Sequence, residues 1–173
     1  YSLRRPRIHL ENPAYGEFGD GLMTSPRVAQ AMIGLGLLEA VPEASLLALV
    51  DAQDADGDGI SARANQVWDK RAGRAVFGRF GWKANQPSLR QQSAGAAAGD
   101  IGITTTLAAS DACTAAQTAC GQSLAGGTPE MSDEFLDKLE LYARTLAVPH
   151  RRQVNDPQVQ AGERLFTQAG CAT

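Results

Sequence analysis

The chain has 173 residues, a formal net charge of −3 and 43% apolar residues. That composition is typical of an ordinary globular protein, and the length is enough for one domain with its own core, or for one domain and part of another. Basic residues are scattered instead of forming a stripe, so we expect no nucleic-acid partner. The longest mostly apolar run, residues 31–41, is too short to cross a bilayer.

Two helices are predicted in the first third of the chain. Ser25 and Pro26 provide an N-cap and a first-turn proline, and apolar residues follow at mostly helical spacing. This pattern predicts a helix that ends at about Ala40. Pro42 then begins a second helix, which is expected to run to about Val50 because leucines continue at helical spacing up to that point.

A third helix is predicted after Pro87, over the sequence SLRQQSAGAAAG. Its small side chains would let a neighbouring element or a cofactor approach closely. Alternation of apolar and polar residues, which is typical of strands, is short and confined to the region from Ile101 to Leu107. We therefore predict a mainly α fold with long loops.

The clearest amphipathic helix lies over SDEFLDKLELYARTLAVP. Ser132 is its expected N-cap, two acidic residues follow in the first turn, and Pro149 terminates it. Apolar residues recur at i, i+4, i+7 and i+11, which predicts one face that packs into the core. That face consists of Phe135, Leu139, Tyr142 and Leu146, of which Phe135, Leu139 and Leu146 are expected to pack into the first domain.

A last helix is predicted from Pro157 onwards, with Asp156 as its cap. The polar connection over residues 149–156 is the predicted linker between two domains. The first domain would comprise residues 1–148, and residues 157–173 would form the first helix of the second. We expect the first domain to cover only part of this helix's apolar face, which consists of Val159, Leu165 and Phe166.

The sequence DADGDGISARAN matches most of a calcium-binding loop. Asp54, Asp56 and Asp58 occupy positions 1, 3 and 5, and a glycine allows the tight turn that follows. The Ile60 carbonyl fits position 7, but Asn65 replaces the bidentate glutamate of position 12, which weakens the predicted site. An Asp- and Gly-rich surface turn without a metal is the alternative.

Three cysteines occur in two different settings. Cys113 and Cys120 lie in a polar, glycine-rich segment, where a disulfide is predicted for an oxidising compartment and free thiols are the alternative. Cys171 instead follows the helix-like run AGERLFTQAG and stands two residues before the end of the sequence.

One tryptophan and five potential iron ligands are candidates for cofactor chemistry. Trp82 sits in the glycine-flanked loop GRFGWKA, where a tryptophan is more often a core residue than an electron relay. Methionine and histidine can bind haem iron as axial ligands, but each of those present here is more often a packing or surface residue. They are His9, His150, Met23, Met32 and Met131.

Several motifs resemble those of c-type haem proteins. The order G-x-x-L-F-x-x-x-x-C in GERLFTQAGCAT resembles the first helix of class I cytochrome c domains, in which C-x-x-C-H follows, and LDKLELYARTLAVP resembles the closing helix of a preceding one. With SPRVAQAMIGLGLLEAVPE, DADGDGISARANQVWD and GRFGWKANQPSLRQQSAGAAAGDIGIT, nearly the whole chain resembles the di-haem oxidoreductase family. That family is related to bacterial di-haem cytochrome c peroxidases and is also labelled thiol oxidoreductase.

The resemblance implies a cytochrome c-like fold and two c-type haems in the complete protein, with this chain lying between the two haem-attachment motifs. Cys171 would form the first haem thioether of the second motif. In the related peroxidases one haem takes up electrons and the other reduces peroxide, with a tryptophan and a calcium ion between them. By that analogy Trp82 is the electron relay and the loop at Asp54 is the Ca²⁺ site.

The expected function is that of a periplasmic di-haem c-type oxidoreductase that reduces peroxide, soluble or lipid-anchored through a missing N-terminus. A small cytochrome or a cupredoxin is the expected electron donor. A non-catalytic electron-transfer cytochrome is the alternative, and a calcium-stabilised helical binding module is a weaker one. The fragment itself is expected to be inactive, because neither haem site is complete. The oligomeric state is not predicted.

Overall fold

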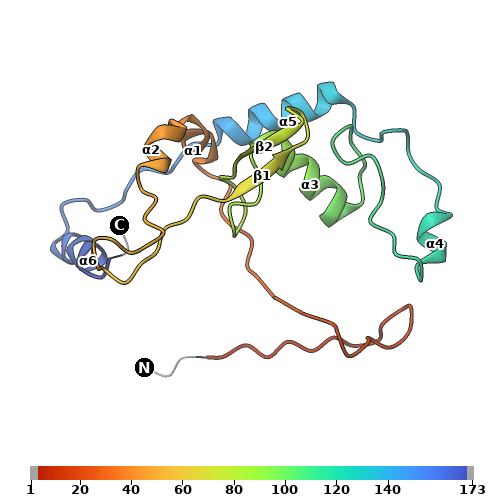
Figure 1. Ribbon diagram of the computed structural model, residues 1–173, viewed down its shortest axis with the longest axis horizontal. Coiled ribbons are helices and arrows are strands. Elements are labelled where there is room, and N and C mark those ends of the chain that lie inside the picture. Colours follow the sequence, from red (N-terminus) through yellow and green to blue (C-terminus); the bar gives the residue numbers. More distant parts are fainter. Residues whose placement is uncertain (1–3, 171–173) are drawn as a thin grey trace.

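The computed structural model describes residues 4–170. Helices α3 and α5 form its centre, α4 and α6 lie at opposite ends, and the segment before α1 runs away from the centre as an extended chain (Figure 1). None of the described helices is long and apolar enough to cross a lipid bilayer. The described elements are α1 (Leu35–Ala40), α2 (Glu43–Leu47), β1 (Gln66–Asp69), β2 (Arg74–Phe77), α3 (Leu89–Ile101), α4 (Thr118–Gly121), α5 (Asp133–Thr145) and α6 (Pro157–Gln168).

The core lies where α3 packs against α5. Ser88 caps α3 through its hydroxyl, which accepts a hydrogen bond from the Gln91 N–H at 3.2 Å. Alanines on the inner face of α3 allow the close approach of a neighbouring helix that the sequence predicted. Full burial of a leucine contributes roughly 1.5–3 kcal/mol, a stabilisation that the fully buried Leu136 supplies at this interface. The apolar cluster comprises Ala94, Ala97, Met131 and Leu136, with Ile103, Leu107 and Leu139 packed against it.

Helix α5 begins at the predicted cap, Ser132, but only part of the predicted face packs into the core, where Leu139 lies against the apolar cluster. Leu136 and Ala143 are fully buried. Phe135 and Tyr142, by contrast, are 58% and 61% exposed. The predicted packing of Phe135 into the first domain was wrong, because the neighbouring residue Leu136 is the one that α5 turns toward the alanines of α3.

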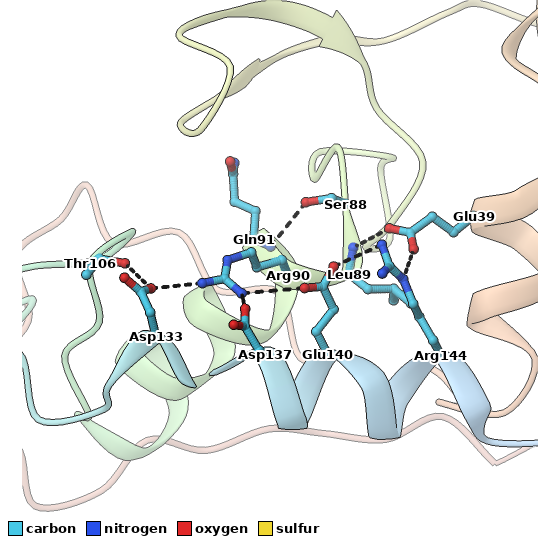
Figure 2. A network of polar contacts seen from close by, with 10 residues as sticks. All are labelled: Glu39, Ser88, Leu89, Arg90, Gln91, Thr106, Asp133, Asp137, Glu140 and Arg144. Carbon is cyan, nitrogen blue, oxygen red and sulfur yellow. Dashed lines mark hydrogen bonds and ion pairs between the residues drawn. The ribbon is translucent and has the colours of Figure 1, made fainter. Parts of the chain in front are cut away.

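A polar network joins α3, α5 and α1 beside this core (Figure 2). The side chain of Arg90 is only 11% exposed and contacts three carboxylates of α5, those of Asp133, Asp137 and Glu140. Burial alone would lower the pKa of the Arg90 guanidinium, but its contacts with Asp137 and Glu140 outweigh burial and raise that pKa. Arg90 therefore stays charged and holds α3 to α5.

Glu39 of α1 is the second centre of this network (Figure 2). One of its carboxylate oxygens accepts the Leu89 N–H at 3.0 Å, at the N-terminus of α3, where the helix dipole favours a negative charge. The other oxygen lies 2.5 Å from Arg144 Nε of α5. Arg144 also pairs with Glu140 at 2.9 Å, so the contacts of Glu39 and Arg90 form one continuous network.

Only the last part of the first predicted helix is helical. Helix α1 begins at Leu35, directly after Gly34, whose φ is +76°. The prediction of helix from Ser25 up to that glycine was wrong, because left-handed backbone cannot continue a right-handed helix. A tertiary contact accompanies the left-handed backbone at Gly34, because its N–H donates to the Leu146 carbonyl at the end of α5 over 2.9 Å.

The two short helices α1 and α2 follow one another across a proline. Helix α1 crosses α5 at Gly36, where a Cβ atom would overlap the Arg144 carbonyl oxygen and lie 2.8 Å from the carbonyl carbon. Only glycine therefore fits at the crossing of α1 and α5.

Helix α2 starts after Pro42 as predicted, but it ends at Leu47 and not near Val50.

Strands β1 and β2 form an antiparallel hairpin that the sequence pattern did not predict. Asp69 pairs with Arg74, and the Asp69 carboxylate closes the turn by accepting the N–H groups of Arg71 and Ala72, each at 2.9 Å. Strands of four residues are too short to show a clear alternation. Helices are thus the main regular structure among the described residues, long loops occupy much of the chain, and the cytochrome c-like arrangement stays a prediction.

A disulfide and a carboxylate organise the loop between α3 and α5. Cys113 and Cys120 are joined by a disulfide, with their Cα atoms 5.8 Å apart. The Glu130 carboxylate fixes the far end of the loop by accepting the N–H of Thr104 at 2.9 Å and that of Gly126 at 3.0 Å. These two amide groups, Thr104 above all, hold the pKa of the Glu130 carboxyl below its usual value.

Helix α6 is capped as predicted and lies apart from the core (Figure 1). Asp156 Oδ1 accepts the Gln158 N–H at 2.7 Å, and Pro157 occupies the first turn. Among the described residues no side chain of α6 is buried, and Leu165 and Phe166 are 64% and 56% exposed. The expected incomplete coverage of its apolar face is confirmed, while the second domain itself stays a prediction.

Candidate cofactor site and acidic loop

An apolar hollow of about 390 Å³ lies between residues 29–32, α1, the loop of residues 79–82 and α3. Its lining is mainly apolar or small, which suits a flat hydrophobic ligand better than a charged one. Helix α3 contributes Ala96, one of the small residues that the sequence predicted to admit a neighbour or cofactor. The lining residues are Ala29, Gln30, Ala31, Met32, Leu35, Leu38, Arg79, Phe80, Gly81, Trp82, Gln92, Ala96 and Asp100.

Trp82 occupies the rim of this hollow and is 55% exposed. A tryptophan that plugs a core would be covered on all sides, so the described residues leave the indole free for a further contact. The loop that presents it is rigidly placed, because the Asn65 amide nitrogen donates to the carbonyls of Lys83 and Ala84, each at 3.0 Å.

Arg79 connects the tryptophan loop to α1. Its Nη1 donates to the carbonyls of Glu39 at 3.1 Å and Val41 at 2.5 Å, with a longer contact of 3.3 Å to Leu38. These carbonyls lie at the C-terminus of α1, where most of the last carbonyls lack an intrahelical donor and a cation is favourable. One guanidinium therefore sets the position of the loop carrying Trp82 relative to the helix that forms the opposite side of the hollow.

The five methionines and histidines are distributed very differently with respect to the hollow. Met32 lines it and is 45% exposed. Met131 is buried in the α3–α5 core, and Met23 is 93% exposed on the extended segment. His9 and His150 are exposed and do not belong to its lining. Cys171, the predicted haem-attachment residue, lies outside the described residues.

The predicted metal loop forms a closed turn at the surface. Backbone hydrogen bonds of 3.0 Å in both directions between Asp51 and Ala62 join its two ends. Carboxylate oxygens of Asp51, Asp54 and Asp56 lie within 4.8 Å of one another. The Ala55 N–H, followed by other amide groups of the loop, lowers the pKa of the Asp51 carboxyl, so this residue keeps its negative charge. The arrangement offers hard oxygen ligands of the kind that Ca²⁺ prefers.

The structure brings together only part of the predicted ligand set. Asp54 and Asp56 converge with Asp51, which the sequence pattern did not include because it stands before the first loop position. Asp58 Oδ1 accepts the Ile60 N–H at 2.7 Å, and the Ile60 side chain is 53% exposed. The side-chain amide of Asn65 bonds to the tryptophan loop, as described above.

A larger open hollow of about 580 Å³ runs along α6. Polar and charged side chains form nearly all of its lining, which is unsuited to an apolar cofactor. On its rim Glu163 pairs with Arg151 through two contacts of 3.0 Å, and this pairing lowers the pKa of the Glu163 carboxyl. The smaller hollow at Trp82 is therefore the better candidate for a cofactor site.

An apolar hollow with a tryptophan at its rim and a thioether in its lining has the composition expected of a site for a hydrophobic ligand. A family model described as "Di-haem oxidoreductase, putative peroxidase" matches residues 15–173. The chain belongs to the di-haem oxidoreductase family. No curated protein and no solved structure shows a significant match to it.

The family description makes haem the implied cofactor. The residues of the hollow fit a part of such a group, because alanines, leucines, a phenylalanine and a tryptophan can lie against a flat porphyrin face. Sequence reasoning singled out Trp82 but not the hollow itself, since its four sides come from segments up to about 70 positions apart in the chain. The helix predicted over residues 25–34 was a second reason why the hollow was not predicted, because a helix would have turned part of that segment away from α3.

Proposed function

We propose that the chain is part of a periplasmic di-haem c-type oxidoreductase that reduces peroxide with electrons relayed between two haems. The observation that supports this most directly is the family match across residues 15–173, in a chain whose apolar hollow has Trp82 at its rim. A small cytochrome or a cupredoxin would be the electron donor. Residues 157–173 would begin a second cytochrome c-like domain, and their exposed apolar face would pack within it.

The bound haems would supply the redox chemistry, and this chain would position them. Cys171 would provide a thioether attachment. The hollow would cover part of a haem face and exclude water from it, while Trp82, exposed at its rim, would lie between the haems as an electron relay. Arg79 would hold the tryptophan loop against α1.

We expect the haem-loaded protein, produced with the sequence that flanks residues 1–173, to contain two haems c and to turn over hydrogen peroxide. Trp82→Phe should slow electron transfer between the haems, measured by stopped-flow absorbance after half-reduction. The free energy of unfolding should change by no more than about 0.5 kcal/mol, because the side chain is 55% exposed.

Trp68→Phe is the matched control for that experiment. Trp68 is 61% exposed on β1 and is not part of the hollow, so its replacement should leave inter-haem electron transfer unchanged. Equal rates in both variants and the wild type would exclude Trp82 as a relay. Two haems without peroxide turnover would favour a non-catalytic electron-transfer cytochrome, and absence of haem would favour a calcium-stabilised helical module.

We also propose that the acidic loop holds a structural Ca²⁺ ion. Three carboxylates have oxygens within 4.8 Å of one another, and a cation between them would relieve their mutual repulsion. Asp54, with φ of +53°, and the glycines of the loop, at +74° and +84°, adopt the left-handed backbone that a tight ligand loop requires. Affinity should be modest, on the order of 10⁻⁴ M, because the pattern lacks the bidentate glutamate of strong sites.

Calorimetry should detect one calcium ion per chain, and Asp51→Ala and Asp56→Ala should each abolish the measurable heat. Each variant removes one of three carboxylates that supply the charge of the site. Asp111→Ala is the control, since Asp111 lies outside this cluster, and it should bind calcium like the wild type. Equal heats from Asp51→Ala and the wild type, with loss in Asp58→Ala, would restore the ligand set predicted from the sequence pattern.

A further inference from the structure

We propose that residues 7–11 close onto the free edge of strand β2 and become a third strand of the β1–β2 hairpin. The structure describes this run, RIHLE, in an open position, on the extended arm of residues 4–33 that leads to α1 (Figure 1). The proposal concerns a conformational change within the chain. It goes beyond the proposed function and does not depend on a bound cofactor.

One edge of the hairpin is already occupied. The side chain of Gln91, on α3, bonds to the outer edge of β1. Its Nε2 donates to the Trp68 carbonyl at 3.0 Å, and its Oε1 accepts the Lys70 N–H at 2.9 Å. Such cover protects a short edge strand from further pairing. A third strand could therefore be added at β1 only by displacing Gln91.

The outer edge of β2 lacks a cover of this kind. The Gly78 N–H bonds to the Asn65 carbonyl at 2.9 Å, and the alternation of an antiparallel ladder then places the backbone groups of Ala75 and Phe77 on the outside. Among the described residues no hydrogen bond reaches these outer groups, and Ala75 is exposed. Unpaired N–H and C=O groups along an edge are a template for another strand.

Residues 7–11 have the features of a short strand. A proline precedes them, and Asn12, whose φ is +53°, ends the run before a second proline. Ile8 and Leu10 alternate with polar residues and are 55% and 53% exposed in the open position. Two apolar positions are too few to predict a strand from the sequence alone, but the open edge of β2 supplies the partner that such a strand needs.

One antiparallel register pairs opposite charges. With Glu11 opposite Arg74, a carboxylate meets a guanidinium across the two strands, which is a favourable cross-strand pair. Both residues are exposed, and the ion pairs of the described residues include neither of them. This register therefore gives each charge a partner that it lacks in the open position.

The same register extends an apolar face of the hairpin. Trp68 and Ala75 lie opposite each other on β1 and β2, and the indole is 61% exposed. Leu10 would lie next to Ala75, whose small side chain lets the indole reach across to it. Ile8 would lie next to Phe77 on the same face. A shift of one residue would turn Ile8 and Leu10 to the other face, so the apolar pattern and the charges select the same register.

The arm can reach this edge within its own molecule. Arg79, two residues beyond the end of β2, donates to the Val41 carbonyl at the end of α1, and the arm joins the other end of that helix. The connection over residues 12–33 spans roughly 3.3 Å per residue when extended, far more than the length of a six-residue helix. A tethered strand also has a high effective concentration, which favours the edge of its own hairpin over that of a second copy.

Closure would anchor the arm at both ends. Gly34 is already tied to α5 by its hydrogen bond to Leu146, and residues 7–11 would fix the other end on the hairpin. Residues 29–32, which line the apolar hollow, lie between the two anchors. A closed arm would therefore hold that side of the hollow in place and would shield Trp68 from solvent.

Disulfide trapping in the protein with its flanking sequence tests this closure. His9 and Val76 would form a non-hydrogen-bonded pair with Cα atoms about 4.5 Å apart, a separation that a disulfide can bridge. The double variant His9→Cys/Val76→Cys should therefore form a disulfide in oxidised glutathione, detected by mass spectrometry as a cross-linked peptide. Leu10→Cys/Val76→Cys is the matched control and should give no cross-link, because its two side chains would lie on opposite faces of the sheet.

Charge reversal tests the register in the His9→Cys/Val76→Cys background. Glu11→Lys should lower the yield of the cross-link, because it places like charges opposite each other, and the further substitution Arg74→Glu should restore it. Circular dichroism of each variant separates loss of closure from unfolding.

Three results would overturn the proposal. Equal yields from the two cysteine pairs would show random collision of the arm with the hairpin. A yield that charge reversal leaves unchanged in folded protein would exclude the register. A cross-link found only between two copies, separated as a dimer by size-exclusion chromatography, would replace closure within one chain by strand exchange.

Discussion

Arg90→Leu should lower the free energy of unfolding by about 2–3 kcal/mol, measured by urea denaturation followed by circular dichroism. The Arg90 side chain is only 11% exposed, so its removal leaves three carboxylates of α5 facing one another without their shared cation. Loss of a buried partner alone costs roughly 3–5 kcal/mol. The lower value applies here because Asp133 and Asp137 are 56% and 66% exposed and are screened by water.

Lys138→Met, on α5, provides the control for a solvent-exposed ion pair. Lys138 pairs with Glu134 at 2.7 Å, but their side chains are 70% and 80% exposed. An exposed pair of this kind is worth about 0.3–0.5 kcal/mol, so the control should be almost neutral. If Arg90→Leu were equally neutral, the network of Figure 2 would contribute nothing beyond ordinary surface pairs.

Gly36→Ala should destabilise the chain by about 2 kcal/mol, in spite of the better helix propensity of alanine. The new Cβ would overlap the Arg144 carbonyl oxygen and lie 2.8 Å from its carbon, and a backbone group cannot rotate aside. Helix α1 would have to move away from α5. That movement would also stretch the contacts that Glu39 makes with Leu89 and Arg144.

Gly99→Ala in α3 should raise the free energy of unfolding, in contrast to Gly36→Ala. No heavy atom of a neighbouring element lies within 4 Å of the position that its Cβ would occupy, so the substitution should stabilise by about 0.5–1 kcal/mol through helix propensity alone. Thermal unfolding of the two variants side by side separates the crossing contact from propensity. A stabilising Gly36→Ala would show that α1 does not approach α5 as closely as described.

The elements that were predicted well are those with local signals. Ser132 and Asp156 accept N–H groups of the residues that follow them, and such caps depend only on a few neighbours in sequence. Helices α5 and α6 therefore began where expected. The buried face of α5 could not be found in the same way, because the choice between Leu136 and Phe135 is made by the alanine surface of α3.

The errors come from long-range contacts. The helix expected from Ser25 is absent before Gly34, whose left-handed backbone serves a hydrogen bond to Leu146, more than a hundred positions away. The spacing of apolar residues carries no trace of such a bond. The hairpin of β1 and β2 was not predicted for a different reason: each of its strands has only four residues, too few to show alternation.

The candidate site could be predicted only as separate residues. Asp54, Asp56 and Trp82 were proposed from short motifs; the structure brings the two aspartates close to Asp51 and places Trp82 in the lining of the hollow. Asp51 was missed because it precedes the calcium motif and joins the group only when the loop closes. The place of Met32 in the lining of the hollow could be found only from the structure, because that lining combines segments far apart in the chain.

Helix α1 has six residues, which is far too few for a helix to be stable by itself. Its order is maintained from outside, by Arg79 at its last carbonyls and by the bonds of Glu39 to Leu89 and Arg144. Such a segment should acquire its structure late in folding and should be among the first to open in hydrogen exchange. Because α1 also forms one side of the hollow, the hollow would stay accessible until the rest of the chain had folded, and a bulky cofactor could enter before it closed.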